Sequence, residues 1–144
     1  MLHHSSIRTR DIHRAIAFYE RLGFGVEERF TTGMTLACWL QGLGTRLELI
    51  QVPEPHPVAD AFGDEHYTGY YHLSFDLTDR ATSLPDWLNQ LQERFGGSKG
   101  PEDLRILLDP CQQIIGDRVY EITFIADADG LPLEFLRVIG EVQR

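Results

Sequence analysis

The sequence predicts an α+β protein built from two similar halves. Each half reads as one strand, one helix and then three further strands. The opening strand of each half carries the same pattern, a histidine, a serine two residues later and an aspartate seven residues after the histidine (H-x-S-Φ-x-x-x-D). These observations predict an internal duplication within one domain, residues 1–144, with a first βαβββ module at 1–52, a linker at 53–68 and a second module at 69–144.

The first half contains one clear helix. Asp11 is its expected N-cap, because a carboxylate there accepts hydrogen bonds from the first unpaired backbone N–H groups. Gly23 ends it, in a position that favours positive φ. The apolar residues between them recur every three or four positions, as a single buried face requires: Ile12, Ala15, Ile16, Tyr19 and Leu22. The strands of this half are predicted at 3–9, 25–30, 35–40 and 46–52.

The second half repeats this order after a linker with three prolines and several acidic residues. Ser83 is the expected N-cap of its helix, with Asp86 three residues later in a capping-box pattern. The pair Gly96–Gly97 is expected to stop the helix. A strand opens at His72, and further strands are predicted at 105–108, 118–125 and 131–138. Turns are predicted at the polar positions Asp109, Asp117 and Asp129–Gly130.

Composition and charge exclude several classes of partner. The 144 residues carry a formal net charge of −9, which argues against nucleic acid and anionic membranes as partners because both require basic patches. No apolar run is long enough to span a bilayer, and no signal-peptide pattern is present. The two cysteines resemble ordinary reduced thiols, so a cytoplasmic location is expected.

Histidine and glutamate occur at equivalent points of both halves. His4 and His72 open the first strand of each half, and Glu48 and Glu134 alternate with bulky apolar residues on a later strand. If the halves curl around one cleft, two imidazoles and two carboxylates can converge there, a set that suits Fe, Mn, Co, Ni or Zn. The same spacing also fits two exposed strand glutamates and two hydrogen-bonded histidines. The residues alone leave both interpretations open.

Four segments in order resemble the vicinal oxygen chelate superfamily. They are HSSIRTRDIHRAIAFYERLGF, TRLELIQV, GYYHLSFDL and ITFIADADGLPLEF, and together they extend the resemblance over essentially the whole chain. This superfamily includes glyoxalase I, methylmalonyl-CoA epimerase, extradiol dioxygenases, fosfomycin-modifying enzymes and bleomycin-binding proteins. The resemblance implies paired βαβββ modules that form an open barrel-like sheet around a metal cleft.

Within the superfamily, the sequence is most similar to glyoxalase I. The glyoxalase I ligand pattern falls on His4, Glu48, His72 and Glu134, which implies one divalent transition metal (Ni, Co, Fe, Mn or Zn). It also implies a lyase or isomerase that acts on a small oxygenated substrate through a metal-bound enediolate. Glu134 is the first choice for the catalytic base and Glu48 the second.

Three further residues are candidates around this site. Arg8 stands four residues after His4, where glyoxalase I has an arginine that contacts a carboxylate, so it could clamp an anionic substrate or be a surface arginine. Glu121 could face the cleft and contact the substrate or be an ordinary strand glutamate. His3 is expected to point to the face opposite His4, and it replaces His4 as the candidate if the strand register is shifted by one.

Two other functions remain open. An extradiol-type dioxygenase would use Fe(II) with two histidines and one carboxylate, which leaves Glu48 surplus. A ligand-sequestering resistance protein would bind a drug without turnover. Val52 stands where glyoxalase I has an asparagine that helps to bind glutathione, so the substrate is also open. The resemblance implies a homodimer, since two chains pair to complete two sites in many members. In other members the two halves of one chain close the cleft, and both arrangements fit a chain with four ligands.

Overall fold

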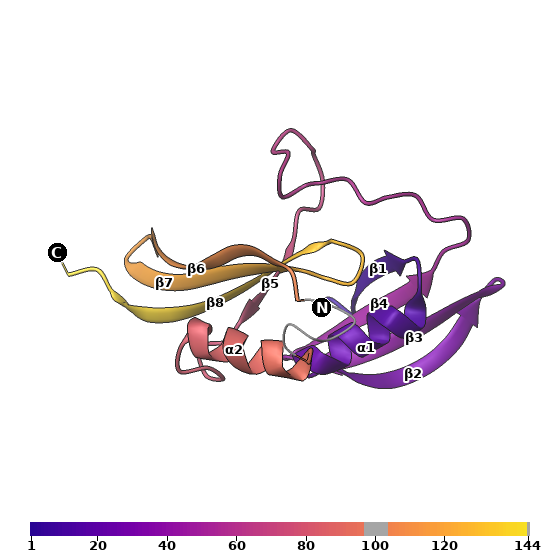
Figure 1. Cartoon of the computed structure of the whole chain (residues 1–144), viewed down its shortest axis with the longest axis horizontal. Coiled ribbons are helices and arrows are strands. Elements are labelled where there is room, and N and C mark those ends of the chain that lie inside the picture. Colours follow the sequence, from indigo (N-terminus) through magenta and orange to yellow (C-terminus); the bar gives the residue numbers. More distant parts are fainter. Residues whose placement is uncertain (97–103, 144) are drawn as a thin grey trace. The chain divides into compact units, whose positions relative to one another are not determined.

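The computed structural model describes residues 1–96 and 104–143. The chain divides into two compact units, Met1–Ala59 (unit 1) and Asp60–Arg144 (unit 2). Each unit contains a four-stranded sheet and one helix in the order strand, helix, strand, strand, strand (Figure 1). The predicted α+β class and the βαβββ order of both halves are therefore confirmed. Each sheet is open rather than closed into a barrel.

Unit 1 has the strand order β1-β4-β3-β2. The first and last strands of the unit pair in parallel, and the remaining neighbours pair antiparallel. The helix α1 packs on one face of the sheet, against β4 and β2 (Figure 1). The elements are β1 (Ser5–Thr9), α1 (Ile12–Leu22), β2 (Gly25–Thr32), β3 (Thr35–Gly42) and β4 (Thr45–Gln51).

Unit 2 repeats this topology with the strand order β5-β8-β7-β6. Its first and last strands again pair in parallel, and its helix packs against β7 and β8. The repeat in the sequence thus corresponds to a repeat in strand pairing. The elements are β5 (Leu73–Asp76), α2 (Leu84–Arg94), β6 (Ile106–Ile115), β7 (Arg118–Ala126) and β8 (Pro132–Glu141).

Both helices begin and end where their capping residues predict. The Asp11 carboxylate accepts hydrogen bonds from the backbone N–H groups of His13 and Arg14, and Gly23 ends α1 at φ 109°. The Ser83 hydroxyl caps α2 by accepting from the Asp86 N–H. Gly96 follows α2 at φ 84°, whereas Gly97, the other predicted stop residue, lies outside the described residues.

The helix-facing side of each sheet forms the core of its unit. In unit 1 the side chains of Leu40, Leu47 and Leu49 are at most 1% exposed, and Tyr19 of α1 is fully buried with them. Strand geometry sends alternate side chains to opposite faces, so this burial fixes which residues remain on the other face. That other face carries Ser6, Glu48 and Trp39 in unit 1.

Three local predictions differ from the structure. His4 and His72 each lie just before a strand rather than inside it, because β1 begins at Ser5 and β5 at Leu73. The strand predicted at 105–108 extends to Ile115 as β6. Asp109 is therefore a strand residue and not a turn residue, since register shifts on both sides of Leu108 accommodate Pro110, which cannot donate to the ladder.

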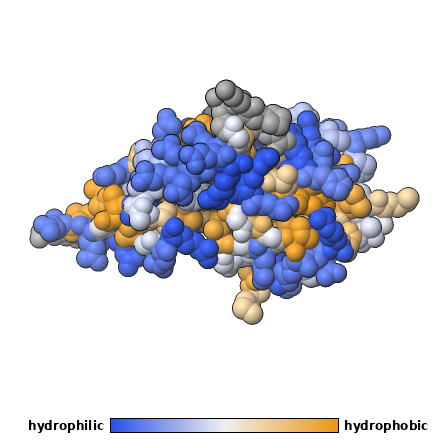
Figure 2. All heavy atoms as spheres, turned by 60° about the horizontal axis from the view of Figure 1, so that its bottom comes forward, coloured by the Kyte–Doolittle hydropathy of each residue, from blue (hydrophilic) through white to orange (hydrophobic). Residues whose placement is uncertain are grey.

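The segment 53–68 contains no helix or strand, as its prolines predict. The turns predicted at Asp117 and at Asp129–Gly130 are also present. No helix within 1–96 or 104–143 is long and apolar enough to cross a membrane. Figure 2 shows a face on which hydrophilic residues predominate and hydrophobic residues form smaller groups.

Candidate functional site

In unit 1 a row of three residues crosses the sheet on the face away from α1. Strand register pairs Ser6 with Glu48 in the parallel β1–β4 ladder and Glu48 with Trp39 in the antiparallel β4–β3 ladder. Residues paired in this way project from the same face. Ser6 Oγ donates to Glu48 Oε1 over 2.8 Å, and Trp39 Nε1 donates to Glu48 Oε2 over 2.9 Å.

His4 completes this cluster, because its Nε2 atom lies 3.5 Å from Glu48 Oε1. The side chains of His4 and Glu48 are 27% and 13% exposed, so both can be reached from solvent. Burial acts to raise the pKa of Glu48, but hydrogen bonds from Trp39 and Ser6, helped by His4 and His3, leave the pKa below its ordinary value. Glu48 is therefore an ionised carboxylate with both oxygens held.

His3 lies beside His4, not on the opposite face as predicted. The Nδ1 atoms of the two rings are 2.7 Å apart, and His3 also packs edge-on against Trp39 at 5.1 Å between ring centroids. Strand alternation does not apply to the pair because both residues precede β1. One imidazole therefore donates to the other through Nδ1, which leaves His4 Nε2 facing Glu48.

Unit 2 contains the same arrangement at equivalent register. Ser74 pairs with Glu134, and its hydroxyl donates to Glu134 Oε1 over 2.6 Å. His72 Nε2 lies 3.7 Å from the same oxygen. Phe124 occupies the cross-strand position next to Glu134, which is the place that Trp39 takes in unit 1. The Phe124 side chain has no N–H group, so within the described residues Glu134 receives one side-chain hydrogen bond where Glu48 receives two.

Aromatic rings surround His72. Tyr71 packs edge-on against it at 4.4 Å, and Phe124 does so at 4.9 Å. Phe62, from the segment before β5, packs against Phe124 at 5.3 Å. Burial and the nearby Glu134 carboxylate raise the pKa of Tyr71. His72 Nδ1 is buried and has no hydrogen-bond partner among the described residues.

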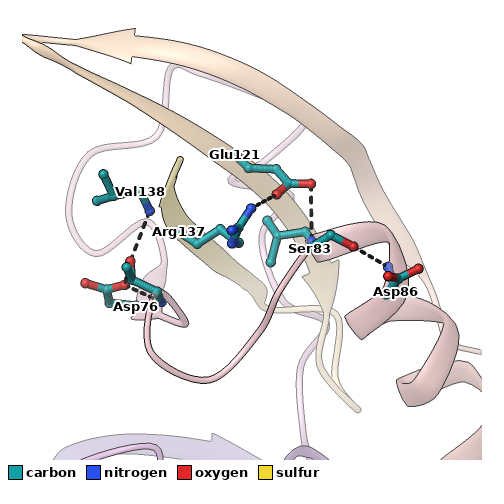
Figure 3. A network of polar contacts seen from close by, with 8 residues as sticks. Asp76, Ser83, Asp86, Glu121, Arg137 and Val138 are labelled. Atoms are coloured by element: carbon teal, nitrogen blue, oxygen red, sulfur yellow. Dashed lines mark hydrogen bonds and ion pairs between the residues drawn. The ribbon is translucent and has the colours of Figure 1, made fainter. Parts of the chain in front are cut away.

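The two predicted substrate contacts are placed differently. Arg8 is exposed on β1 and shares the face of Ser6, two residues along the strand. Glu121 lies on the opposite, helix-facing side of the unit 2 sheet. There its carboxylate accepts from Arg137 Nη1 at 2.8 Å and from the Leu84 N–H at 3.2 Å (Figure 3). Glu121 thus anchors the start of α2 and is not grouped with Glu134.

Each unit therefore brings together one predicted histidine and one predicted glutamate. Imidazole nitrogen and carboxylate oxygen are donors that Zn, Fe, Ni, Co and Mn accept. The unpaired Nδ1 of His72 and the position of each histidine Nε2 beside a carboxylate oxygen fit a ligand role. Within the described parts of the chain, no three His, Cys, Asp or Glu side chains lie in a group that could hold a metal ion. Each unit therefore supplies one histidine–glutamate pair. We name these pairs the His4–Glu48 and His72–Glu134 half-sites.

Four residues beside the glutamates were not among the predicted site residues: Ser6, Ser74, Trp39 and Phe124. The serines had a signal in the sequence, because they are the shared third position of the repeated H-x-S pattern. No sequence pattern pointed to the two aromatic residues, because their place beside the glutamates depends on the register of β3 with β4 and of β7 with β8.

The protein consists of two βαβββ modules, each with a His–Ser–Glu cluster on the sheet face away from its helix. A family model described as the glyoxalase/bleomycin resistance protein/dioxygenase superfamily matches residues 3–93. The chain belongs to this superfamily. The superfamily includes many enzymes, and its members often use a divalent metal. A search of curated proteins gave no significant match.

Solved structures of this superfamily share the fold. A glyoxalase family protein from Enterococcus faecalis is 21% identical with a TM-score of 0.70, covering 95% of this chain and 97% of its own. A domain from Frankia sp. EAN1pec is 20% identical with a TM-score of 0.64, covering 96% and 98%. A protein from Alicyclobacillus acidocaldarius is 21% identical with a TM-score of 0.61, covering 94% and 89%. At these identities the likeness establishes the fold alone.

Proposed function

We propose that this protein is a metal-dependent lyase or isomerase, closest to the glyoxalase I-like members of its superfamily, that acts on a small oxygenated substrate. The observation that carries the proposal is the repeated cluster itself. A histidine and a glutamate lie 3.5 Å apart in unit 1 and 3.7 Å apart in unit 2, each with a serine donating to the same carboxylate oxygen. Two duplicated clusters of this kind favour a shared role over two unrelated surface pairs.

The proposed metal ligands are His4, Glu48, His72 and Glu134. They would supply two nitrogen and two carboxylate donors to one divalent ion (Ni, Co, Fe, Mn or Zn). When bound, such an ion supplies Lewis-acid chemistry, polarising substrate oxygens and stabilising the negative charge that develops on them. A homodimer is part of the proposal, because two chains complete the sites in many superfamily members.

Glu134 is the proposed catalytic base. An isomerase of this type moves one proton between adjacent carbons, so it needs a carboxylate that can take up a proton and return it. Both oxygens of Glu48 accept hydrogen bonds, whereas Glu134 accepts one, from Ser74 to Oε1. Glu134 Oε2 has no side-chain donor within the described residues and is therefore the carboxylate oxygen left open to a substrate proton. Glu48 remains the second choice.

Arg8 is the proposed anchor for an anionic group of the substrate. It is exposed on the same sheet face as Ser6, and it forms no ion pair within 1–96 or 104–143. Its guanidinium can therefore bind a carboxylate through two parallel hydrogen bonds. Arg8→Ala should raise KM for an anionic substrate more than it lowers kcat.

The deciding experiment measures the metal content of tag-free protein by elemental mass spectrometry. Wild type, Glu48→Gln and His72→Ala would be compared, with Glu93→Gln on the exposed surface of α2 as the matched control. About one transition metal per chain in wild type and in the control, sharply reduced in both site variants, supports the four-ligand proposal. Hemithioacetal and epimerase substrates would then be assayed.

Two other results would point to the rival functions. Metal retained by Glu48→Gln but lost by His72→Ala indicates a site with three ligands, as in an extradiol dioxygenase, and oxygen uptake with catechols would then be measured. Wild type that binds no metal after exposure to Ni, Co, Mn, Fe or Zn overturns the enzyme proposal and favours a ligand-sequestering protein.

A further inference from the structure

The two half-sites differ at one position of otherwise equivalent rows. Trp39 and Phe124 are the cross-strand partners of Glu48 and Glu134, respectively. The indole Nε1–H of Trp39 donates to Glu48 Oε2, and a phenylalanine side chain cannot donate. The serine donors on the other side are common to both rows. The number of donors on each glutamate is therefore set by a single residue.

The Trp39 ring is held in place from several sides within unit 1. Phe30 packs against it at 5.3 Å and His3 at 5.1 Å between ring centroids, both edge-on. The Arg46 guanidinium lies over the ring at 5.7 Å and is itself fixed by an ion pair with Glu27 at 2.9 Å. An indole restrained in this way keeps its N–H directed at Glu48.

We propose that Trp39 is a positioning residue that holds Glu48 as a fixed metal ligand. Glu134 has no such positioning residue, because Phe124 occupies the equivalent place and its side chain cannot donate. The inference rests on the proposed function. With one donor on each oxygen, the Glu48 carboxylate cannot rotate away without breaking a hydrogen bond. Partners that orient a ligating carboxylate typically change metal affinity by about 10–100-fold when they are removed.

The test titrates the metal-free protein with Co²⁺ and compares Trp39→Phe with Trp87→Phe. Trp87 is the other tryptophan of the chain and packs against Phe135 on the helix-facing side of unit 2. We expect Kd for Co²⁺ to rise about 10–100-fold in Trp39→Phe and to change less than about twofold in Trp87→Phe. The Co²⁺ absorption bands should also shift in Trp39→Phe, because the orientation of a ligand changes.

Fluorescence gives a second readout that needs no substrate. In Trp87→Phe the emission comes from Trp39 alone, and Co²⁺ should quench it in a saturable way with the Kd of wild type. In Trp39→Phe the remaining Trp87 emission should respond little. If Trp39→Phe does not fold by circular dichroism, the quenching of Trp39 emission in Trp87→Phe remains as the test.

The two proposals fail in different ways. If wild type binds about one Co²⁺ and Trp39→Phe binds it with unchanged Kd and spectrum, the role of Trp39 is wrong and the metal proposal stands. If Trp39→Phe does not fold, unquenched Trp39 emission during the Co²⁺ titration of Trp87→Phe overturns the role of Trp39. If wild type binds no Co²⁺, the proposed function itself is overturned, and the role of Trp39 with it.

Discussion

The two glutamates show how one donor changes the character of a carboxylate. Glu48 and Glu134 occupy the same register position in the two sheets and face a histidine and a serine in the same way. Ser6 and Trp39 hold Glu48, whereas Ser74 is the one side-chain donor to Glu134 within residues 1–96 and 104–143. Two side chains of identical chemistry therefore differ in how many hydrogen bonds restrain them.

Removal of each serine should expose this difference. Ser74→Ala removes the one side-chain donor that Glu134 has, but Ser6→Ala leaves Glu48 with Trp39. A hydrogen bond to a charged group contributes about 1.5–3 kcal/mol, so we expect Ser74→Ala to weaken Co²⁺ binding by about tenfold or more. Ser6→Ala should have a smaller effect in calorimetric titration. Equal effects would contradict the proposed asymmetry.

Asp76, at the end of β5, should make stability depend on acid pH. Its carboxylate accepts from the backbone N–H and the hydroxyl of Thr78, and Thr78 Oγ in turn accepts from the Val138 N–H (Figure 3). The side-chain and backbone hydrogen bonds from Thr78 lower the pKa of Asp76, and they outweigh the opposing effect of burial. A group whose folded pKa is depressed stabilises the fold above its unfolded pKa of about 3.9.

This stabilisation is lost as the pH falls through the folded pKa of Asp76, below about 4. Urea unfolding from about pH 5 to about pH 2.5 should therefore show wild type losing more free energy of unfolding than Asp76→Asn, which keeps an acceptor but does not titrate. The two curves should converge toward the acid end. Parallel curves across this range would show that Asp76 is not responsible.

Local sequence patterns predicted only part of each candidate cluster. Histidine and glutamate were found because each repeats at the same place in both halves. The position of His3 was wrong because strand alternation was applied to residues that precede the strand. The donors to Glu48 come from β1 and β3, 42 and 9 residues away, and such contacts follow from strand pairing rather than from spacing along the chain.

At the scale of elements, Glu121 joins α2 to its sheet. Its carboxylate binds Arg137 on β8 and the first N–H group of the helix (Figure 3). Both side chains of the ion pair are less than 20% exposed. Negative charge at a helix N-terminus is also favourable, because that end of the helix carries partial positive charge.

Glu121→Leu should therefore destabilise the protein by about 1–3 kcal/mol, since Arg137 is left partly buried without its partner. The double variant Glu121→Leu/Arg137→Met should lose less, because no unpaired charge remains. Both effects can be measured by urea unfolding, and the Co²⁺ affinity of each folded variant should match wild type. A loss of Co²⁺ affinity in Glu121→Leu would instead indicate that Glu121 contributes to the metal site.

Elements with explicit capping residues were predictable, and those shaped by irregular pairing were not. The start and end of α1 were predicted from Asp11 and Gly23, and the start of α2 from Ser83 and Asp86. The strand β6 was truncated in the prediction because Asp109–Pro110 reads as a break. The pairing with β7 absorbs that dipeptide through register shifts, a solution that depends on the partner strand.

At the scale of the whole molecule, metal binding should increase the free energy of unfolding. A ligand that binds only the folded state stabilises it by about 2.7 kcal/mol at a free concentration of 100 times Kd. The midpoint temperature of thermal unfolding should therefore rise when Co²⁺ is added and fall back when EDTA removes the metal. His4→Ala and His72→Ala should show little shift. An upward shift of the same size in both variants would place the binding elsewhere.

The parallel pairing of first and last strands has a consequence for synthesis on the ribosome. Ser6 and Glu48 are 42 residues apart, and Ser74 and Glu134 are 60 residues apart. Neither half-site exists until the last strand of its unit has left the exit tunnel. Because domains fold vectorially as they emerge, the His4–Glu48 half-site can be complete while most of unit 2 is still untranslated. The nascent chain then carries its firmly held carboxylate well before the second one is made.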